Sequence, residues 1–194
     1  MKKIQHSLLT LLAVIFVLSS CNKNDGPSYD PEVQFQIEKP IIATYVSTNY
    51  PGMQYSSDTT GIWFEVTEPG IANSYEYKIV DTVYQGYQTK MVRPPEITVR
   101  YTGKLVSNNQ VFDSNNTEAG FKSKLNSLIS AWQIAFQPKS IGEYKVGGST
   151  PKGLQKGSKI RFVTPSYFAY GNQNQGIIPA NSPLYFEIEV LDIK

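Results

Sequence analysis

The sequence predicts an α+β domain in which a twisted antiparallel β-sheet packs on one short α-helix. Composition is the first observation, because thirteen Tyr, twelve Pro and fourteen Gly among 194 residues favour strands and turns over helices. The second is that alternation of apolar and polar residues recurs after residue 61, whereas only one short segment follows the helical period convincingly. With 40% hydrophobic and 18% charged residues, the chain is expected to form one globular domain plus some additional chain.

The first twenty residues have the pattern of a signal peptide. Lys2 and Lys3 form a positively charged start, and residues 8–18 form an apolar run that is too short to span a bilayer. We therefore expect residues 1–20 to be absent from the mature protein.

The residues that close this segment, Leu18 to Cys21, resemble the lipobox of bacterial lipoproteins. The resemblance implies cleavage before Cys21 and lipidation of that residue, with more than one acyl chain and hence a stable membrane anchor. An ordinary secretory signal followed by a chance cysteine is the alternative. Asn22 after the cysteine favours the outer membrane. The expected location is a bacterial cell envelope, at the outer membrane or the periplasmic face rather than in the cytoplasm.

Cleavage at this point restricts the chemistry of the mature chain. His6 is the only histidine and leaves with the signal peptide, and Cys21 is the only cysteine and carries the lipid. A Ser-His-Asp triad, a cysteine nucleophile and a zinc site with His or Cys ligands are thereby excluded, and no cofactor or metal is expected. Loss of two lysines leaves sixteen basic and sixteen acidic side chains, a balance that gives no reason to expect nucleic acid as a partner.

Residues 21–60 are expected to connect the anchor to the domain. Residues 22–31 are polar and turn-rich, which predicts a tether. Residues 32–48 follow a loose helical period that Pro40 is expected to break or kink. The apolar positions of that period are Phe35, Ile37, Ile41, Ile42, Tyr45 and Val46. Two interpretations stay open, in which residues 32–57 either pack on the domain or form a dimerisation arm.

The domain itself is predicted to span residues 61–194 and to begin with strands. A short β-rich run at 61–70 is closed by a Pro-Gly pair. Residues 74–92 alternate and contain Gln85-Gly86 as a turn candidate, which predicts a hairpin. Residues 96–106 alternate apolar and polar side chains in the manner of a half-buried strand.

Two further strands are predicted near the end of the chain. In residues 159–164, Ile160 and Phe162 are expected to face inward and the two basic side chains outward. In residues 184–193, the even-numbered apolar residues are expected to face inward, with Glu187 and Glu189 outward. Those inward positions are Leu184, Phe186, Ile188 and Val190.

One short helix is predicted between the strands, over residues 124–136. Five apolar side chains recur there at helical spacing, namely Leu125, Leu128, Ile129, Trp132 and Phe136. The following glycine- and lysine-rich stretch, 137–153, lacks the spacing of a phosphate-binding loop and is interpreted as a surface insertion.

Several short motifs occur in a fixed order along the domain. They are Val99-Arg100-Tyr101-Thr102-Gly103, Phe112-Asp113-Ser114, Leu128-Ile129-x-x-Trp132, Gly157-x-x-x-x-Phe162, Phe168-Ala169-Tyr170-Gly171, Ile177-Ile178-Pro179 and Leu184-x-Phe186. In this order they resemble the FKBP-type peptidyl-prolyl cis–trans isomerases, over roughly residues 61–194. The chain departs from that family at Arg100, Ala131 and Ala180. These departures bear on substrate preference and on affinity for macrolide inhibitors.

The resemblance implies a sheet of about five strands curled around the helix, with a hydrophobic pocket between them that receives a proline ring. The residues it assigns to catalysis are Tyr101, Phe112, Asp113, Trp132, Tyr170 and Phe186. The residues it assigns to substrate binding are Leu128, Ile129, Ile177, Ile178 and Phe121. Trp132 would form the floor, and the Ile129 N–H and the Tyr170 hydroxyl would donate hydrogen bonds to substrate carbonyls.

Such a mechanism suits a chain without histidine or thiol. Rotation about an X–Pro bond is slow because it breaks amide resonance, with a barrier of ~18–20 kcal/mol. The planar bond is more dipolar than the twisted one, so a water-poor aromatic pocket favours the twisted form without any proton transfer. A ten-thousandfold acceleration needs only about 5.5 kcal/mol of that preference.

The sequence therefore predicts a membrane-anchored prolyl isomerase that assists folding of exported proteins and acts on their proline-containing segments. A non-catalytic binding or chaperone module is the alternative, in which the same pocket, or the hairpin and the 137–153 insertion, would hold a partner protein. A component of a surface assembly is a third possibility, which only the lipid anchor supports.

Overall fold

The computed structural model describes residues 29–194. The predicted signal peptide, the lipidation site Cys21 and residues 22–28 of the tether lie outside the described residues. Within the described part of the chain, no helix is long and apolar enough to cross a membrane.

A long N-terminal helix, α1 (Pro31–Asn49), precedes the sheet. Its N-cap is Asp30, whose carboxylate accepts the backbone N–H of Glu32 at 2.9 Å, and Pro31 occupies the first turn, where its missing N–H has no cost. The predicted helix is thus confirmed, but the predicted break at Pro40 is wrong because α1 continues through it. We attribute this to packing of the second half of α1 on the sheet, which compensates for one missing backbone hydrogen bond.

The core of the molecule is a seven-stranded antiparallel sheet with the order β1-β2-β10-β11-β5-β6, to which β7 adds by pairing with β5. The resemblance implied about five strands. The bounds are β1 (Gln54–Tyr55), β2 (Trp63–Pro69), β5 (Glu96–Leu105), β6 (Val111–Asn115), β7 (Phe121–Lys124), β10 (Ser158–Thr164) and β11 (Leu184–Ile193). The long strand β5 joins both halves, because β6 pairs with its C-terminal part and β7 with its N-terminal part.

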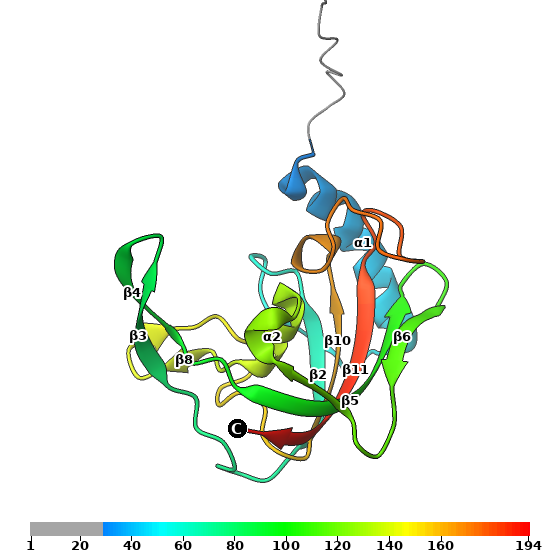
Figure 1. The fold of residues 1–194 in the computed structure, drawn as a ribbon. Coiled ribbons are helices and arrows are strands. Elements are labelled where there is room, and N and C mark those ends of the chain that lie inside the picture. Colours follow the sequence, from blue (N-terminus) through cyan, green and yellow to red (C-terminus); the bar gives the residue numbers. More distant parts are fainter. Residues whose placement is uncertain (1–28) are drawn as a thin grey trace, which may run out of the picture.

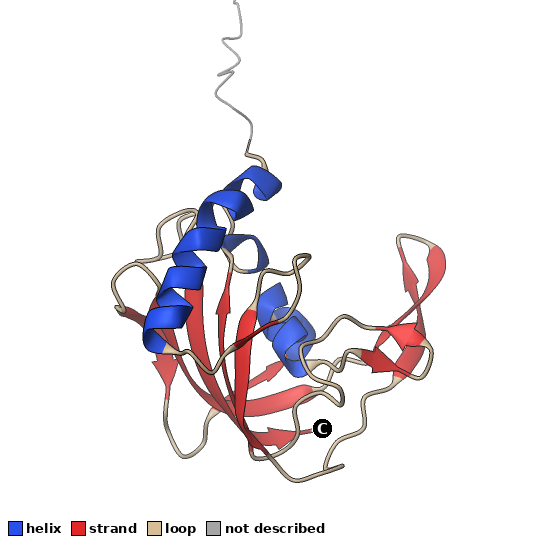
Figure 2. Cartoon of the chain, turned by 180° about the vertical axis from the view of Figure 1, so that it is seen from behind, coloured by secondary structure: helices blue, strands red, loops and turns tan. Residues whose placement is uncertain are grey.

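The two central strands β10 and β11 are buried on the inner face and partly buried on the outer face. On the inner face, Phe162, Phe186 and their alternate neighbours pack against α2 (Ser130–Phe136) in the main core. On the outer face, Val163 and Tyr185 are buried beneath α1 in a second cluster. The inward positions predicted for residues 184–193 are all buried, but the sequence did not indicate that the opposite face of these strands would be covered too. Figures 1 and 2 show the two helices on opposite faces of the sheet.

Residues 32–57 therefore pack on the domain. The side chains of Ile42, Tyr45, Val46 and Met53 are buried in the outer cluster, and the Tyr45 hydroxyl donates to Asn109 Oδ1 at 2.7 Å. This is the first of the two interpretations that the sequence left open.

The predicted helix 124–136 is shorter than expected. Residues Leu125–Ser127 form a single 3-10 turn, η1, and only Ser130–Phe136 are α-helical. Between them Leu128 and Ile129 are extended, with ψ values of 166° and 150°. Lys124 belongs to strand β7.

The predicted hairpin is confirmed as β3 (Ile79–Tyr84) and β4 (Tyr87–Val92). Its turn residues Gln85 and Gly86 both have positive φ, 49° and 84°, as a two-residue type I′ turn requires. The hairpin projects from the body of the molecule beside a smaller hairpin of β8 (Ser140–Ile141) and β9 (Tyr144–Lys145) (Figure 1).

The stretch 137–153, interpreted from the sequence as a surface insertion, is partly built into the core. The Ser149 N–H donates to the carbonyl of Ile134 in α2 at 2.9 Å, and the Lys139 N–H donates to the Thr150 carbonyl at 2.7 Å. Gly148 and Ser149 are buried. The second of these hydrogen bonds joins the two ends of the segment to each other, and the first ties them to α2.

We expect Gly148→Ala to destabilise the protein by more than ~2 kcal/mol, because a Cβ there would overlap the Gln137 carbonyl. Gly147→Ala is the matched control, since its Cβ meets nothing within 4 Å and only its φ of 86° is unfavourable, at a cost of about 1–2 kcal/mol. Urea unfolding of both variants measures the difference. Equal losses would show that segment 137–153 is not packed as described.

Candidate active site

One small cavity collects eight of the eleven pocket residues predicted from the sequence. It has a volume of about 110 Å³ and lies between α2 and the concave side of the sheet. Its lining consists of Tyr101, Asp113, Phe121, Leu128, Ile129, Trp132, Tyr170 and Phe186. These residues come from β5, β6, β7, β11, α2, the turn before α2 and the residues after η2 (Ser166–Phe168), so the tertiary fold alone brings them together.

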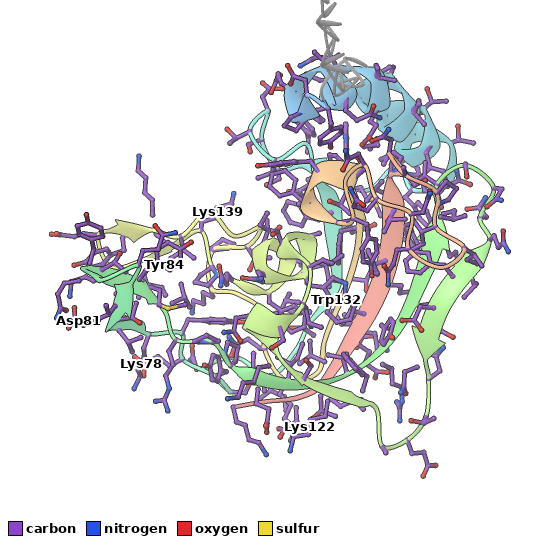
Figure 3. All side chains as sticks on the ribbon, turned by 45° about the horizontal axis from the view of Figure 1, so that its top comes forward. Lys78, Asp81, Tyr84, Lys122, Trp132 and Lys139 are labelled. Carbon is purple, nitrogen blue, oxygen red and sulfur yellow. The ribbon has the colours of Figure 1, made fainter. Side chains whose placement is uncertain are left out.

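Trp132 is held in one orientation by aromatic neighbours. Its side chain meets the rings of Tyr101 and Phe186 edge to face, with centroid distances of 5.2 and 5.8 Å. On α2 it stacks with Phe136 at 6.3 Å. Only 4% of Trp132 is exposed, because sheet and helix enclose it (Figure 3). Edge-to-face contacts of this kind fix a ring more strongly than burial alone. The indole therefore forms a rigid floor.

The other three predicted residues, Phe112, Ile177 and Ile178, are not part of the cavity lining. Phe112 packs edge to face against Phe186, a lining residue, at a centroid distance of 5.6 Å. Ile178 is buried in the main core, whereas Ile177 is 53% exposed. The backbones of Gln175 and Ile178 exchange two hydrogen bonds of 2.9 Å. This tight turn directs the two isoleucines to opposite sides.

The polar side of the cavity is formed by Tyr101 and Asp113. The Tyr101 hydroxyl donates to Asp113 Oδ2 at 2.6 Å. Burial raises the pKa of Tyr101 above its ordinary value, and the hydrogen bond to Asp113 raises it further. Burial also raises the pKa of the Tyr170 hydroxyl, with a further contribution from the Asp113 charge. Both phenols therefore stay neutral over the physiological range.

Two backbone groups before α2 complete the site. Within residues 29–194, the Ile129 N–H donates to no protein acceptor. The side-chain amide of Gln133 donates to the Leu128 carbonyl at 3.0 Å and so holds this extended turn in place. Sequence reasoning assigned the Ile129 N–H but missed Gln133, because a glutamine on the polar side of a short helix carries no distinctive signal.

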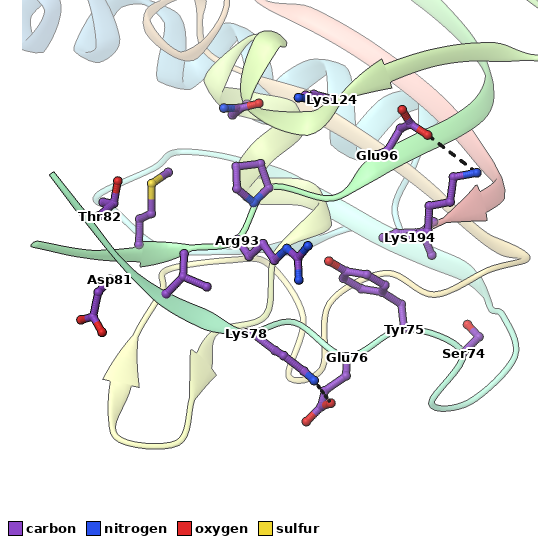
Figure 4. Close-up of a pocket in the computed structure, with 15 residues that line it drawn as sticks. Ser74, Tyr75, Glu76, Lys78, Asp81, Thr82, Arg93, Glu96, Lys124 and Lys194 are labelled. Carbon is purple, nitrogen blue, oxygen red and sulfur yellow. Dashed lines mark ion pairs between the residues drawn. The ribbon is translucent and has the colours of Figure 1, made fainter. Parts of the chain in front are cut away.

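A larger cavity, of about 910 Å³, lies beneath the β3–β4 hairpin (Figure 4). Its lining is rich in charged side chains, of which Lys78 pairs with Glu76 and Lys194 with Glu96. It has no aromatic floor comparable to Trp132, and none of the predicted pocket residues lines it. We therefore assign the candidate active site to the small aromatic cavity. Within the described residues, no cluster of His, Cys, Asp or Glu could hold a metal ion.

Comparisons with known proteins show the family to which the chain belongs. Residues 87–191 match the family model of FKBP-type peptidyl-prolyl cis-trans isomerases, which is more than half of the chain. The chain therefore belongs to the FKBP-type peptidyl-prolyl cis-trans isomerase family, as the ordered motifs predicted.

Among curated proteins, the FKBP-type isomerase FkpA of Buchnera aphidicola is 32% identical over 116 residues, which are 60% of this chain and 40% of that protein. FK506-binding protein 4 of Chaetomium thermophilum is 34% identical over 100 residues, which are 50% of this chain and 17% of that protein. The chain thus spans less than half the length of these relatives.

Two solved structures share the fold. A peptidyl-prolyl isomerase of Pseudomonas syringae has a TM-score of 0.55 and 24% identity, covering 87% of this chain and 99% of its own. FkpA of Escherichia coli also has a TM-score of 0.55 and 24% identity, covering 84% of this chain and 62% of its own. The predicted α+β fold, an antiparallel sheet around a short helix, is confirmed.

Any isomerase activity is expected to be independent of pH between about 7 and 10, as far as the phenols of Tyr101 and Tyr170 determine it. The pKa of both is raised in the folded state, whereas an unfolded chain ionises its tyrosines near pH 10. The contribution of these two tyrosines to the free energy of unfolding is therefore fully present below about pH 10. It is lost as the pH rises towards their pKa values in the folded state. Both expectations are checked by measuring activity, melting temperature and tyrosinate absorbance on the same samples as a function of pH. A fall in activity between about pH 7 and 9 without loss of fold would contradict it.

Proposed function

We propose that this chain catalyses cis–trans isomerisation of X–Pro bonds in exported polypeptides and so assists their folding at the cell envelope. The observation that carries the proposal is the aromatic cavity with Trp132 as its floor and the Tyr101–Asp113 hydrogen bond at its polar side.

The cavity suits a proline ring in size and chemistry. At about 110 Å³ it is somewhat smaller than the engineered apolar cavity of about 150 Å³ that binds benzene. Aromatic side chains dominate its lining. A five-membered saturated ring would bury its apolar surface there, while the attached peptide bonds remain near the polar rim.

The chemistry requires no general acid or base. The twisted transition state is less dipolar than the planar bond, so transfer from water to an aromatic site favours it. In this proposal the Tyr170 hydroxyl and the Ile129 N–H, which has no acceptor within residues 29–194, donate hydrogen bonds to substrate carbonyl oxygens and orient the chain across the cavity. Differential binding of this kind accounts for a reaction in a site without histidine or cysteine.

The decisive experiment is an isomerisation assay on a short X–Pro peptide with residues 21–194 carrying Cys21→Ser. The wild-type domain should accelerate the reaction. Asp113→Ala removes a hydrogen bond to a charged group, worth about 1.5–3 kcal/mol, and should lower kcat/KM roughly tenfold or more. Asp81→Ala on the β3–β4 hairpin removes an exposed carboxylate paired with Lys90 and is the matched control. A wild-type rate equal to the uncatalysed rate would reject the proposal.

The envelope location rests on the sequence of residues 1–22, where the apolar run and the lipobox-like Leu18 to Cys21 support a lipid anchor. Fractionation of cells that express the full chain tests it. The wild-type protein should stay with the membrane fraction, and Cys21→Ser should release it. Retention of both forms in the same soluble fraction would contradict a lipid anchor.

A non-catalytic binding module is the second candidate function, and the projecting hairpin is the observation that favours it. Val83, Tyr84 and Tyr87 at its tip are 61%, 67% and 77% exposed, which is unusual for three neighbouring apolar side chains. The isomerisation assay separates the two candidates, because a binding module would show no acceleration.

A further inference from the structure

A buried carboxylate connects α1 to the candidate active site. Glu38 lies in the middle of α1, and only 1% of it is exposed. Burial of a carboxylate is costly unless hydrogen bonds satisfy it. Glu38 Oε2 accepts the backbone N–H of Ser166 at 2.8 Å, and Oε1 accepts the Ser166 hydroxyl and the side-chain amide of Gln34. Within residues 29–194, no Lys or Arg side chain pairs with it, so these donors alone hold the carboxylate.

Ser166 in turn organises the chain around Tyr170. Its carbonyl oxygen accepts hydrogen bonds from the N–H groups of Ala169 and Gly171, both at 2.8 Å. The residues on either side of Tyr170 therefore donate to the same oxygen. The Gly171 carbonyl accepts the N–H of Asn181 at 2.8 Å, which ties the turn to the far end of the same loop. Tyr170 itself lines the aromatic cavity. A continuous series of hydrogen bonds therefore runs from Glu38 to the residues that carry Tyr170.

Apolar contacts reinforce the connection at the same place. A Cβ at Gly61 would overlap the ring of Phe35 and approach Pro165, which shows that α1, residue 61 and the residue before Ser166 are closely packed. In Figure 1 the short orange turn that contains Ser166 lies directly beneath α1. The matched family segment, residues 87–191, includes Ser166 and Tyr170 but not α1.

We propose that Glu38 is a positioning residue for the candidate active site, which acts through Ser166 to hold the Tyr170 hydroxyl at the cavity. This inference rests on the proposed isomerase function and deepens it. The helix α1 then has two separable parts. Ile42, Tyr45 and Val46 stabilise the domain by covering the outer face of the sheet, whereas Glu38 orders one wall of the site.

The test compares Glu38→Ala with Ile42→Ala in the full chain. Ile42 is one turn further along α1, is also 1% exposed and bonds to nothing in the Tyr170 loop. Both variants are assayed at a temperature at which circular dichroism shows them folded. Glu38→Ala should lower kcat/KM about tenfold, since displacements near 1 Å cost up to about a hundredfold. Ile42→Ala should keep kcat/KM within twofold of wild type despite a lower melting temperature.

Rescue and amide exchange separate positioning from simple destabilisation. Glu38→Gln keeps an acceptor oxygen for the Ser166 N–H, so its kcat/KM should be close to that of wild type. This variant can be assayed even if Glu38→Ala fails to fold. Hydrogen exchange at Ala169 and Gly171 should accelerate in Glu38→Ala and not in Ile42→Ala. Equal kcat/KM for these two variants, or unchanged exchange at both amides, would overturn the inference. If wild type is inactive, the proposed function fails, and the exchange measurement still decides whether Glu38 holds the loop.

Discussion

Replacing Trp132 with alanine is expected to abolish most of the isomerase activity, with kcat/KM reduced about a hundredfold, equivalent to ~2.7 kcal/mol of transition-state stabilisation. The indole is the floor of the cavity and contacts the rings of Tyr101 and Phe186, so its removal enlarges the site and admits water. The free energy of unfolding should fall by ~3–5 kcal/mol as well, because Trp132 is almost fully buried. Peptide isomerisation and urea unfolding measure the two effects.

Trp63→Ala is the matched control, since Trp63 is the only other tryptophan. It lies on β2, where it packs against the outer cluster and against Tyr55 at 5.0 Å, and it is not part of the cavity lining. It should cost stability without changing kcat/KM in the folded protein. A Trp132→Ala variant with wild-type kcat/KM would place the reaction elsewhere in the molecule.

Tyr185→Ala is expected to have the second largest effect, and this effect should be on stability alone. Tyr185 is 1% exposed beneath α1, where it stacks on Tyr50 at 4.7 Å and lies under the Lys104 ammonium. Loss of such an aromatic side chain should lower the free energy of unfolding by ~3–5 kcal/mol, a large part of the ~5–15 kcal/mol typical of a domain. Its side chain points away from the cavity, so activity per folded molecule should be retained.

Tyr84→Ala provides the comparison for Tyr185. Tyr84 is exposed on the projecting hairpin, and a substitution there should change the free energy of unfolding by less than about 0.5 kcal/mol. Thermal and urea unfolding of both variants are the measurements. If Tyr185→Ala were as stable as Tyr84→Ala, α1 would not form a second core with the sheet.

These two predictions describe a sheet that serves different purposes on its two faces. Phe186 and Tyr185 are consecutive residues of β11, yet one lines the candidate active site and the other is buried beneath α1. Successive side chains of a strand point to opposite faces, so a single strand takes part in both. Substitutions in β10 and β11 should accordingly separate into those that affect activity and those that affect stability alone.

Much of the site was accessible from the sequence because its signals are local. Tyr101, Asp113, Trp132 and Tyr170 each lie within a short motif, and the resemblance of the ordered motifs to the FKBP family implied that they would converge. Eight of the eleven predicted residues do line one cavity. The positions of Ile177 and Ile178 were less accessible, since adjacent residues in a tight turn can face either way and the pattern does not specify which.

Glu38 is the clearest example of a residue that sequence reasoning passed over. It lies three residues after Phe35 and four before Ile42, so a charged side chain falls on the apolar period of α1. That conflict was the available signal, because a carboxylate is seldom fully buried without partners. Its partner Ser166 is 128 residues away in the sequence, and no local pattern connects the two.

The sequence by itself determined the strands β2, β5, β10 and β11, the β3–β4 hairpin with its turn, the ordered pocket motifs and membership of an isomerase family, because alternation, turn chemistry and motif spacing are properties of neighbouring residues. Only the tertiary structure decided that α1 covers the outer face of β10 and β11, that the helix before Trp132 is interrupted at Leu128 and Ile129, and that Glu38 supports the Tyr170 loop. The physical reason is that burial and hydrogen bonding of this kind depend on which distant segments meet, and that is settled only when the whole chain packs.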